Sequence, residues 1–263
     1  MNILQQIVEH KKQEISENKK RLPESELREQ AFLRGKRRPF VNSLGMPQED
    51  GINLIAEIKR ASPSKGMIRP DLDVAQYASE YQLGGASALS VLTDSRYFRG
   101  SVEDLKMAKR NTSLPVLRKD FIISSYQIHE SVSMEADAVL LIVRILSSQQ
   151  LKDYINLCKE IGMDVLVETH SREEIETATA AGAKLIGINN RNLSSFKTDV
   201  ETAARLVSLL SPEQNAVAES GIKSREDIEK LMDAGIRNFL VGESLVRATD
   251  AKAFLQNLLG VKL

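Results

Sequence analysis

The sequence predicts an α/β protein, a (β/α)8 TIM barrel with an N-terminal helical extension, on three observations. Eight short apolar segments recur after residue 51, each nearly continuous in apolar character, as in parallel strands covered on both faces. Longer amphipathic segments with helix-start signals alternate with them. Their spacing of roughly 20 to 30 residues fits a closed barrel better than a doubly wound sheet, which usually uses fewer units.

Residues 1–50 stand outside the repeat and are expected to form an extension that packs on the barrel. Its first helix has one apolar stripe, formed by Ile3, Leu4, Ile7, Val8 and Ile15. A weaker second helix is expected over residues 24–33. The basic cluster at residues 36–38 is interpreted as a solvated loop. The extension either closes the bottom of the barrel or lies over its top.

Residues 51–263 are expected to form the barrel, with extension and barrel together making a single domain. The predicted strands cover residues 53–58, 86–92, 115–120, 138–143, 164–169, 184–190, 215–220 and 239–244. Ser171 with Glu174 and Ser224 with Asp227 have capping-box spacing, and Pro212 follows Ser211 at an expected helix start. Glycines that suit helix ends precede several strands, at positions 84, 85, 162, 182 and 235.

Composition and charge exclude several classes of protein. The 36 basic and 36 acidic residues cancel, which gives no steering toward nucleic acid or a membrane. The opening residues are too polar for a signal peptide, and no run approaches the ~20 apolar residues of a membrane span. The single cysteine, Cys158, allows no internal disulfide and is interpreted as a buried apolar side chain. We therefore expect a cytoplasmic protein that binds neither nucleic acid nor membrane.

Motifs for metals and common cofactors are missing from the sequence. It contains no dinucleotide fingerprint, P-loop or nucleophile elbow. His10, His129 and His170 form no cluster with metal-ligand spacing, so we expect no metal site. His10 and His129 are expected at the surface, and His170 is expected to border the site.

Charged and polar side chains concentrate at the C-terminal ends of the predicted strands, where the active sites of such barrels lie. The main ones, in chain order, are Glu57, Lys59, Ser62, Lys119, Glu168, Asn189 and Arg191. Two lysines and two glutamates directed into one pocket can supply a general acid and a general base near neutral pH. Each charge alone could be a structural ion pair, but together they indicate an enzyme.

Two short turns after the last two strands indicate a phosphate site. Ser220-Gly221 and Gly242-Glu243 occupy the loops after strands 7 and 8, which commonly bind phosphate in these barrels. Glycine allows backbone N–H groups to approach phosphate oxygens. Lys59 and Ser62 are expected to face these turns across the barrel mouth.

The strand-end motifs together resemble the indole-3-glycerol-phosphate synthases of tryptophan biosynthesis. The matching segments are IAEIKRASPSKG, ALSVLTDSRYFRGS, LPVLRKDFI, ADAVLLIV, VLVETHS, IGINNRNL, AESGI and FLVGESL, in order over about residues 52–246. The resemblance implies a lyase that needs no metal or cofactor. Its reaction converts 1-(2-carboxyphenylamino)-1-deoxyribulose 5-phosphate into indole-3-glycerol phosphate, carbon dioxide and water. We expect a monomer, with association with other tryptophan-pathway enzymes left open.

The resemblance also implies residue roles. Lys119 is expected to be the general acid for ring closure, Glu168 its partner acid or base, and Lys59 an aid to dehydration. The implied catalytic residues are Glu57, Lys59, Lys119, Glu168, Asn189 and Ser220. The implied substrate-binding residues are Ser62, Phe121, Leu140, Arg191 and Leu193. The implied phosphate-binding residues are Gly221, Gly242 and Glu243, the last through its backbone N–H.

Two alternative functions remain open at this point. One is another phosphosugar barrel, such as phosphoribosylanthranilate isomerase, whose reaction needs one acid and one base; the surplus of lysines argues against it. The other is a noncatalytic barrel that binds a phosphorylated ligand. The chain also has no tryptophan, so any aromatic cover over a substrate ring must come from other residues.

Overall fold

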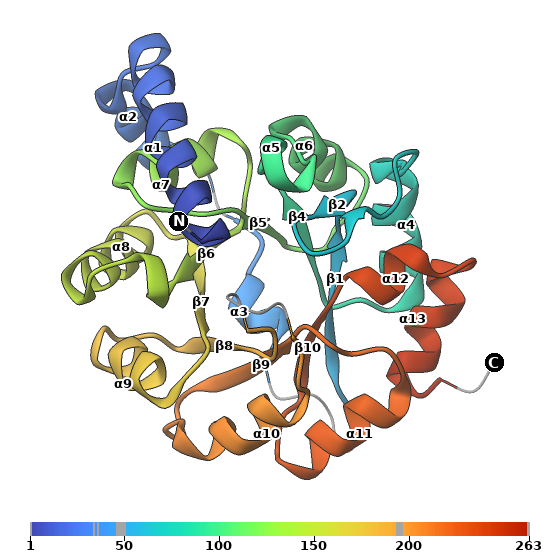
Figure 1. Ribbon diagram of the computed structural model, residues 1–263. Coiled ribbons are helices and arrows are strands. Elements are labelled where there is room, and N and C mark those ends of the chain that lie inside the picture. The colour runs from blue at the N-terminus through green and yellow to red at the C-terminus, as the bar shows by residue number, and fades with distance from the viewer. Residues whose placement is uncertain (1, 34, 36, 46–50, 193–196, 262–263) are drawn as a thin grey trace.

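Eight parallel strands close into a barrel, as the sequence predicts (Figure 1). The computed structural model describes residues 2–33, 35, 37–45, 51–192 and 197–261. The barrel strands are β1 (Asn53–Ile58), β4 (Ala88–Leu92), β5 (Val116–Lys119), β6 (Ala138–Ile142), β7 (Asp164–Thr169), β8 (Leu185–Asn189), β9 (Asn215–Glu219) and β10 (Asn238–Val241). Each pairs with its chain neighbours, and β10 pairs with β1 to close the ring. The last strand ends earlier than predicted, because a short helix begins at Glu243.

Helices alternate with the strands and form the outer layer of the barrel (Figure 1). They are α4 (Val74–Gly84), α6 (Val102–Arg110), α7 (Ser125–Ser133), α8 (Ser148–Glu160), α9 (Arg172–Ala180), α10 (Glu201–Leu206), α11 (Arg225–Asp233) and α13 (Ala251–Leu259). Two short helices follow strands β4 and β10, α5 (Ser95–Phe98) and α12 (Glu243–Arg247). Single 3-10 turns, η1 (Val143–Ile145) and η2 (Val207–Leu209), follow β6 and α10.

Local signals account for most helix ends. Ser224 and Asp227 form a reciprocal capping box at α11, and Gly85 ends α4 with φ 96° in the left-handed region. The expected helix start at Pro212 is wrong. Pro212 lies in a turn before β9, closed by the hydrogen bond from Gln214 N to Ser211 O, because α10 has already begun at Glu201.

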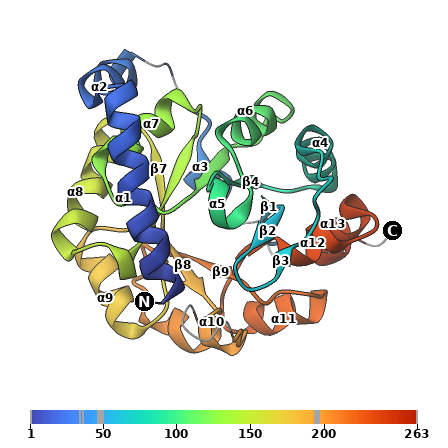
Figure 2. The same ribbon diagram turned by 45° about the horizontal axis from the view of Figure 1, so that its top comes forward.

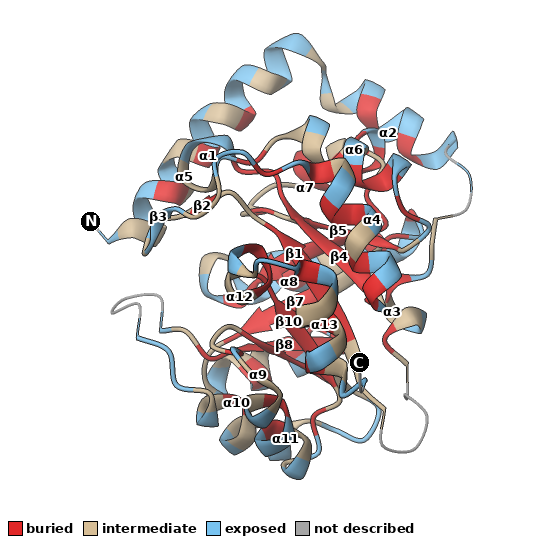
Figure 3. Cartoon of the chain, turned by 90° about the vertical axis from the view of Figure 1, so that its right-hand side faces the viewer, coloured by how far each residue is buried: buried red, intermediate tan, exposed pale blue. Residues whose placement is uncertain are grey.

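The alternation of side chains along each strand separates two buried layers. In β1, Leu54 and Ala56 pack against the helices, while Ile55 belongs to a separate cluster inside the barrel. The strands are buried over almost their whole length, and the exposed surface is on the outer faces of the helices (Figure 3). Because the alternation has a period of two, it also decides which charged residues at the strand ends face inward.

The N-terminal extension reaches both ends of the barrel. Helix α1 (Ile3–Arg21) lies across the mouth, and α2 (Glu24–Leu33) lies beside α7 (Figure 2). At the opposite end, α3 (Phe40–Ser43) inserts Phe40 and the following Leu44 into the inner cluster, where both side chains are buried. The extension therefore closes the bottom and covers part of the top.

The interpretation of residues 36–38 as a solvated loop is wrong for the two described arginines. Arg37 donates to the carbonyl of Ile161, and Arg38 donates to the carbonyl of Leu114 at 2.8 Å. These bonds fasten the linker between α2 and α3 to the lower rim of the barrel.

Across the described ranges, no helix has both the length and the apolar character needed to cross a bilayer. Cys158 is a free, buried thiol, as the sequence predicts.

Candidate active site

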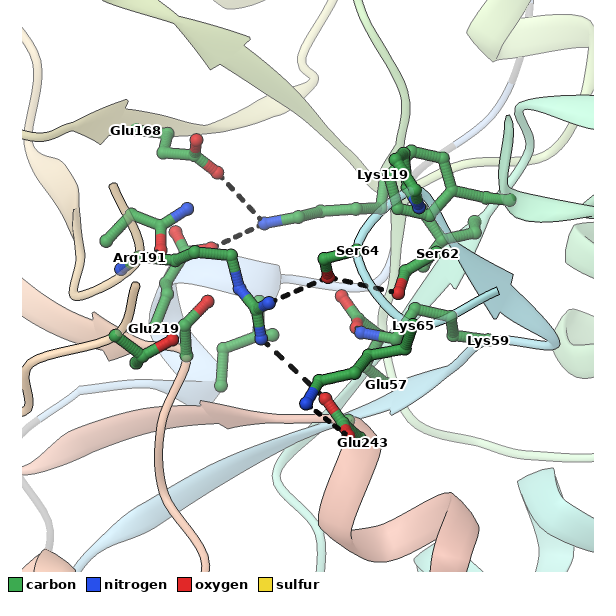
Figure 4. Close-up of a pocket in the computed structure, with 18 of the residues that line it drawn as sticks. Glu57, Lys59, Ser62, Ser64, Lys65, Lys119, Glu168, Arg191, Glu219 and Glu243 are labelled. Atoms are coloured by element: carbon green, nitrogen blue, oxygen red, sulfur yellow. Dashed lines mark hydrogen bonds and ion pairs between the residues drawn. The ribbon is translucent and has the colours of Figure 1, made fainter. Parts of the chain in front are cut away.

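A cavity of about 550 Å³ opens at the C-terminal ends of the strands. Its walls include all the sequence-predicted site residues that the structure describes: Glu57, Lys59, Ser62, Lys119, Phe121, Leu140, Glu168, Asn189, Arg191, Ser220, Gly221, Gly242 and Glu243. Figure 4 shows the charged side chains among them directed toward one space. The remaining predicted residue, Leu193, lies outside the described residues. Segments far apart in the sequence therefore meet around one space.

Lys119 lies at the centre of the charged side chains. Its Nζ is 2.5 Å from Glu219 Oε2 and 3.3 Å from Glu168 Oε2 (Figure 4). The three side chains come from β5, β7 and β9, and each sits two residues after an inward-facing apolar residue of its strand. The ammonium group is thus held by two carboxylates from the strands on either side of β8.

The pKa values of Lys119, Glu168 and Glu219 are shifted in different ways. Burial alone lowers the pKa of Lys119, but the surrounding carboxylates, Glu219 first, outweigh it and raise the pKa above its usual value. Burial also opposes ionisation of Glu168, yet the charges of Lys119 and His170 hold its pKa well below its usual range. Burial raises the pKa of Glu219 to about 7, and Glu168 adds to the shift. The site therefore combines a stable ammonium, a stable carboxylate and a carboxyl group that titrates near neutral pH.

Sequence reasoning did not select Glu219 as a site residue. The end of strand β9 was interpreted only through its Ser-Gly turn. The available signal was the period of two: Val217 faces the inner cluster, so Glu219 must face the cavity. Glu219 Oε1 is buried against Gly187 and has no hydrogen-bond partner within the described part of the chain, while Oε2 faces Lys119.

His170 supports Glu168 from behind. Its Nε2 lies 3.3 Å from Glu168 Oε1, and its Nδ1 lies 3.0 Å from Glu174 Oε2. Burial lowers the pKa of His170, but the two carboxylates raise it to about 9. Arg144 Nε donates to the other oxygen of Glu174 at 2.8 Å. His170 is therefore an imidazolium at neutral pH that contacts Glu168 but does not itself line the cavity.

Glu57 and Lys59 form a second charged pair on the opposite wall. Glu57 is 4% exposed, and its Oε1 is 2.5 Å from Lys59 Nζ. Gly242 packs directly over this carboxylate, since a Cβ at that position would lie 2.4 Å from Glu57 Oε1. The pair at the end of β1 is thus fixed against the turn that follows β10.

The serine-proline segment after β1 is a small hairpin over the mouth. Strands β2 (Ala61–Ser62) and β3 (Gly66–Met67), which the sequence did not predict, pair antiparallel. Arg191 reaches the hairpin by donating to Ser64 Oγ at 2.8 Å, and its other terminal nitrogen lies 3.7 Å from Glu243. These contacts bring the ends of β1, β8 and β10 together (Figure 4).

The two turns predicted to bind phosphate open onto the same cavity. Ser220 and Gly221 both have positive φ, 66° and 88°. Asn190 holds the first of them by donating to the Ser220 carbonyl at 3.0 Å. A Cβ at Gly221 would lie 2.5 Å from Thr198 Cγ2, so the position has no room for a side chain.

An apolar wall faces the charged groups. The rings of Phe98 and Phe121 lie 5.9 Å apart, and Leu140 lines the cavity beside them. Helix α1 completes the wall with Ile3, Leu4 and Ile7. The cavity therefore has an apolar wall with two aromatic rings, although the chain has no tryptophan.

Two other polar side chains, Arg118 at a strand end and His129, have structural roles. Arg118 faces the helix layer, where it donates to Gln127 O and Ser131 Oγ of α7, both at 3.0 Å. His129, expected at the surface, is buried beneath α2 with Nδ1 3.7 Å from Glu24. In the described ranges, no group of three or more His, Cys, Asp or Glu side chains is arranged to hold a metal ion.

The fold and this site together define a class of protein: a (β/α)8 barrel with an acid–base centre and candidate phosphate-binding turns at its mouth. Comparison with known proteins identifies the family. The family model described as indole-3-glycerol phosphate synthase matches residues 4–258. Curated relatives named indole-3-glycerol phosphate synthase, from Desulfosudis oleivorans and Syntrophobacter fumaroxidans, are 56% and 51% identical over 98% of this chain and 98% of each relative. The chain belongs to the indole-3-glycerol phosphate synthase family.

Solved structures show the same architecture at low identity. Thiamine phosphate pyrophosphorylase from Pyrococcus furiosus superposes with a TM-score of 0.60 and 16% identity, over 82% of this chain and 97% of that chain. An N-acetylmannosamine-6-phosphate 2-epimerase from Clostridium perfringens also superposes with a TM-score of 0.60, at 15% identity, over 80% of this chain and 92% of that chain. This likeness concerns the fold alone.

Proposed function

We propose that the chain converts 1-(2-carboxyphenylamino)-1-deoxyribulose 5-phosphate into indole-3-glycerol phosphate with Lys119 as the general acid. The observation that carries the proposal is the Lys119 ammonium held between Glu168 and Glu219 in a cavity that also has an apolar wall and two glycine-containing turns. Membership of the family supports this reaction over the isomerase alternative.

Ring closure requires the substrate ketone to accept a proton while an aryl carbon attacks the carbonyl carbon. The Lys119 ammonium supplies that proton from a desolvated position, where it also stabilises charge on the oxygen. Glu168 stays ionised and orients the ammonium. The new carbon–carbon bond leaves the carboxyl-bearing carbon tetrahedral, and loss of carbon dioxide returns the bonding electrons to the aromatic ring.

Dehydration then removes the hydroxyl group and a proton from the neighbouring carbon. Lys59, paired with Glu57, is placed to protonate the leaving hydroxyl, which departs as water. Glu219 is suited to accept the carbon-bound proton, because its pKa of about 7 leaves a large carboxylate fraction at neutral pH. The two charged pairs thereby divide the acid and base steps between opposite walls.

Substrate orientation is assigned to the remaining residues. Backbone N–H groups of Gly221 and of Gly242-Glu243 are proposed to bind the phosphate, supported by the position of both turns in the cavity wall. Glu243 turns its side chain toward Arg191 and Lys65, which leaves its backbone N–H for the phosphate. Phe121 and Leu140 pack on the aromatic ring, and Ser62, Asn189 and Arg191 orient the polar groups. The expectations of a monomer and of a cytoplasmic location stay predictions.

The test is turnover by the purified protein in the presence of a metal chelator and with no nucleotide added. We expect indole fluorescence to appear with one carbon dioxide released per product, and no turnover of phosphoribosylanthranilate. Calorimetric binding of the carboxyphenylamino substrate without conversion would instead favour a noncatalytic binding barrel. Turnover of phosphoribosylanthranilate alone would favour the isomerase.

A further inference from the structure

Helix α1 carries a buried lysine in the middle of its apolar face. Ile3, Ile7, Lys11 and Ile15 repeat every four residues and so lie along one side of the helix. Ile3 and Ile7 line the cavity, and Ile15 packs in a separate apolar cluster with Leu27 and Tyr126. Lys11 itself is 0% exposed. A buried ammonium group is costly unless it is paired, so its partners must explain its position.

The partners of Lys11 are carboxylates from two different loops of the barrel mouth. Its Nζ lies 3.0 Å from Asp120 Oδ1 and 3.1 Å from Asp94 Oδ2, and both aspartates are buried. Glu14, one turn further along α1, is 3.1 Å away. Burial lowers the pKa of Lys11, but Asp120 and Asp94 outweigh that effect and raise it, so the group stays charged.

Each aspartate also fixes the backbone that carries a ring of the apolar wall. Asp94 caps α5 by accepting from the N–H groups of Tyr97 at 2.6 Å and Phe98 at 3.3 Å. Asp120 accepts from the N–H of Phe121 at 2.8 Å and follows Lys119 directly. Phe98 and Phe121 are the two rings that lie 5.9 Å apart in the cavity wall.

We propose that Lys11 is a positioning residue for the reaction: it ties helix α1 to the loops of Phe98 and Phe121 and so assembles the wall that holds the aromatic ring of the substrate. The inference rests on the proposed function. Lys11 does not line the cavity, so it acts only through these neighbours. Because the phosphate turns follow β9 and β10, which do not neighbour β4 or β5 in the barrel, the wall can loosen without disturbing phosphate binding.

The test compares Lys11→Met with Lys11→Arg, which keeps the charge, and with Lys12→Met as a matched control. Lys12 is the next residue of α1, is exposed and pairs only locally with Glu9 among the described residues. We expect Lys11→Met to raise KM for the substrate about tenfold or more, since small displacements of positioning groups have effects of this size. The dissociation constant for inorganic phosphate should stay within twofold of the unmutated value. Lys11→Arg should recover most of the loss, and Lys12→Met should behave as the unmutated protein.

Two measured results, or a failure of both neutral variants to fold, would overturn the inference. One is a KM for Lys11→Met within twofold of the unmutated value; the other is a parallel weakening of phosphate binding, which marks general loss of structure. Lys11→Gln, neutral but able to hydrogen-bond both aspartates, provides a second variant if Lys11→Met does not fold, and the same rise in KM is expected. Failure of both neutral variants to fold assigns Lys11 a purely structural role. Absence of turnover in the unmutated protein would refute the proposed function instead.

Discussion

The charged His170 should contribute to the free energy of unfolding in a pH-dependent way, and the structure sets the magnitude of that contribution. Its pKa is raised from 6.5 to about 9 in the folded chain, because the charges of Glu168 and Glu174 outweigh its burial. A group whose pKa is raised on folding contributes stability that is fully present below its unfolded pKa and is lost as the pH rises through the folded value. The difference of 9 − 6.5 = 2.5 pKa units corresponds to about 3 kcal/mol.

The perturbation is His170→Gln, which retains polar atoms but cannot carry the charge. Urea unfolding of both proteins at pH 5.5 and pH 10 gives four free energies of unfolding, and urea adds no ionic screening. The advantage of the unmutated protein over His170→Gln should be about 3 kcal/mol larger at pH 5.5 than at pH 10. Other groups that titrate in this range cancel in the difference. An advantage that is independent of pH would show that Glu168 and Glu174 do not hold a charged His170, and the account of this side of the site would be wrong.

Three further substitutions test the catalytic and packing arguments. The kcat/KM of the unmutated protein should fall as the pH drops through about 7, because Glu219 must be ionised to act as a base. Glu219→Gln should abolish this pH dependence and lower kcat about 10²- to 10⁴-fold. An unchanged pH profile would show that Glu219 is not the base. Gly187→Ala should lower kcat about 10²-fold, because its Cβ would lie 2.1 Å from Glu219 Oε1 and displace the carboxylate; activity equal to the unmutated protein would contradict that geometry. Phe40→Ala should lower the free energy of unfolding by about 3–5 kcal/mol, measured by urea titration, because Phe40 is 0% exposed at the base of the barrel; a cost below about 1 kcal/mol would mean that α3 does not close the core.

The sequence predicts the barrel well because its strands are short, apolar and buried on both faces. β6 and β7 illustrate this, since continuous apolar runs mark both strands and Gly162 marks the end of the helix before β7. The β2–β3 hairpin was missed because two-residue strands have no periodicity to detect. The roles of Arg37 and Arg38 were missed because their partners are backbone carbonyls, which no residue pattern reveals.

In the candidate site too, sequence patterns predict some features, while others depend on tertiary contacts that no pattern reveals. Polar residues at strand ends could be gathered into one pocket from the fold alone, and the predicted site residues that the structure describes line the cavity. Arg118 and Lys119 are consecutive residues of β5 whose side chains point to opposite faces of the strand. Only this alternation distinguishes the structural arginine, which faces the helices, from the lysine in the cavity. The role of Lys11 could not be predicted from the sequence, because a lysine is not expected to be buried in the apolar stripe of a helix. Its aspartate partners also lie in loops that are distant in the sequence.

The measurement that tests the role of Lys119 most directly is the steady-state turnover of Lys119→Met beside Lys184→Met. Lys184 is an exposed lysine that pairs with Glu213 away from the cavity, so its loss controls for removal of one positive charge. We expect Lys119→Met to lose about 10³-fold or more in kcat while its affinity for inorganic phosphate stays within twofold. Lys184→Met should keep the unmutated rate. Turnover by Lys119→Met near the unmutated rate would contradict the assignment of this ammonium group as the acid that closes the ring.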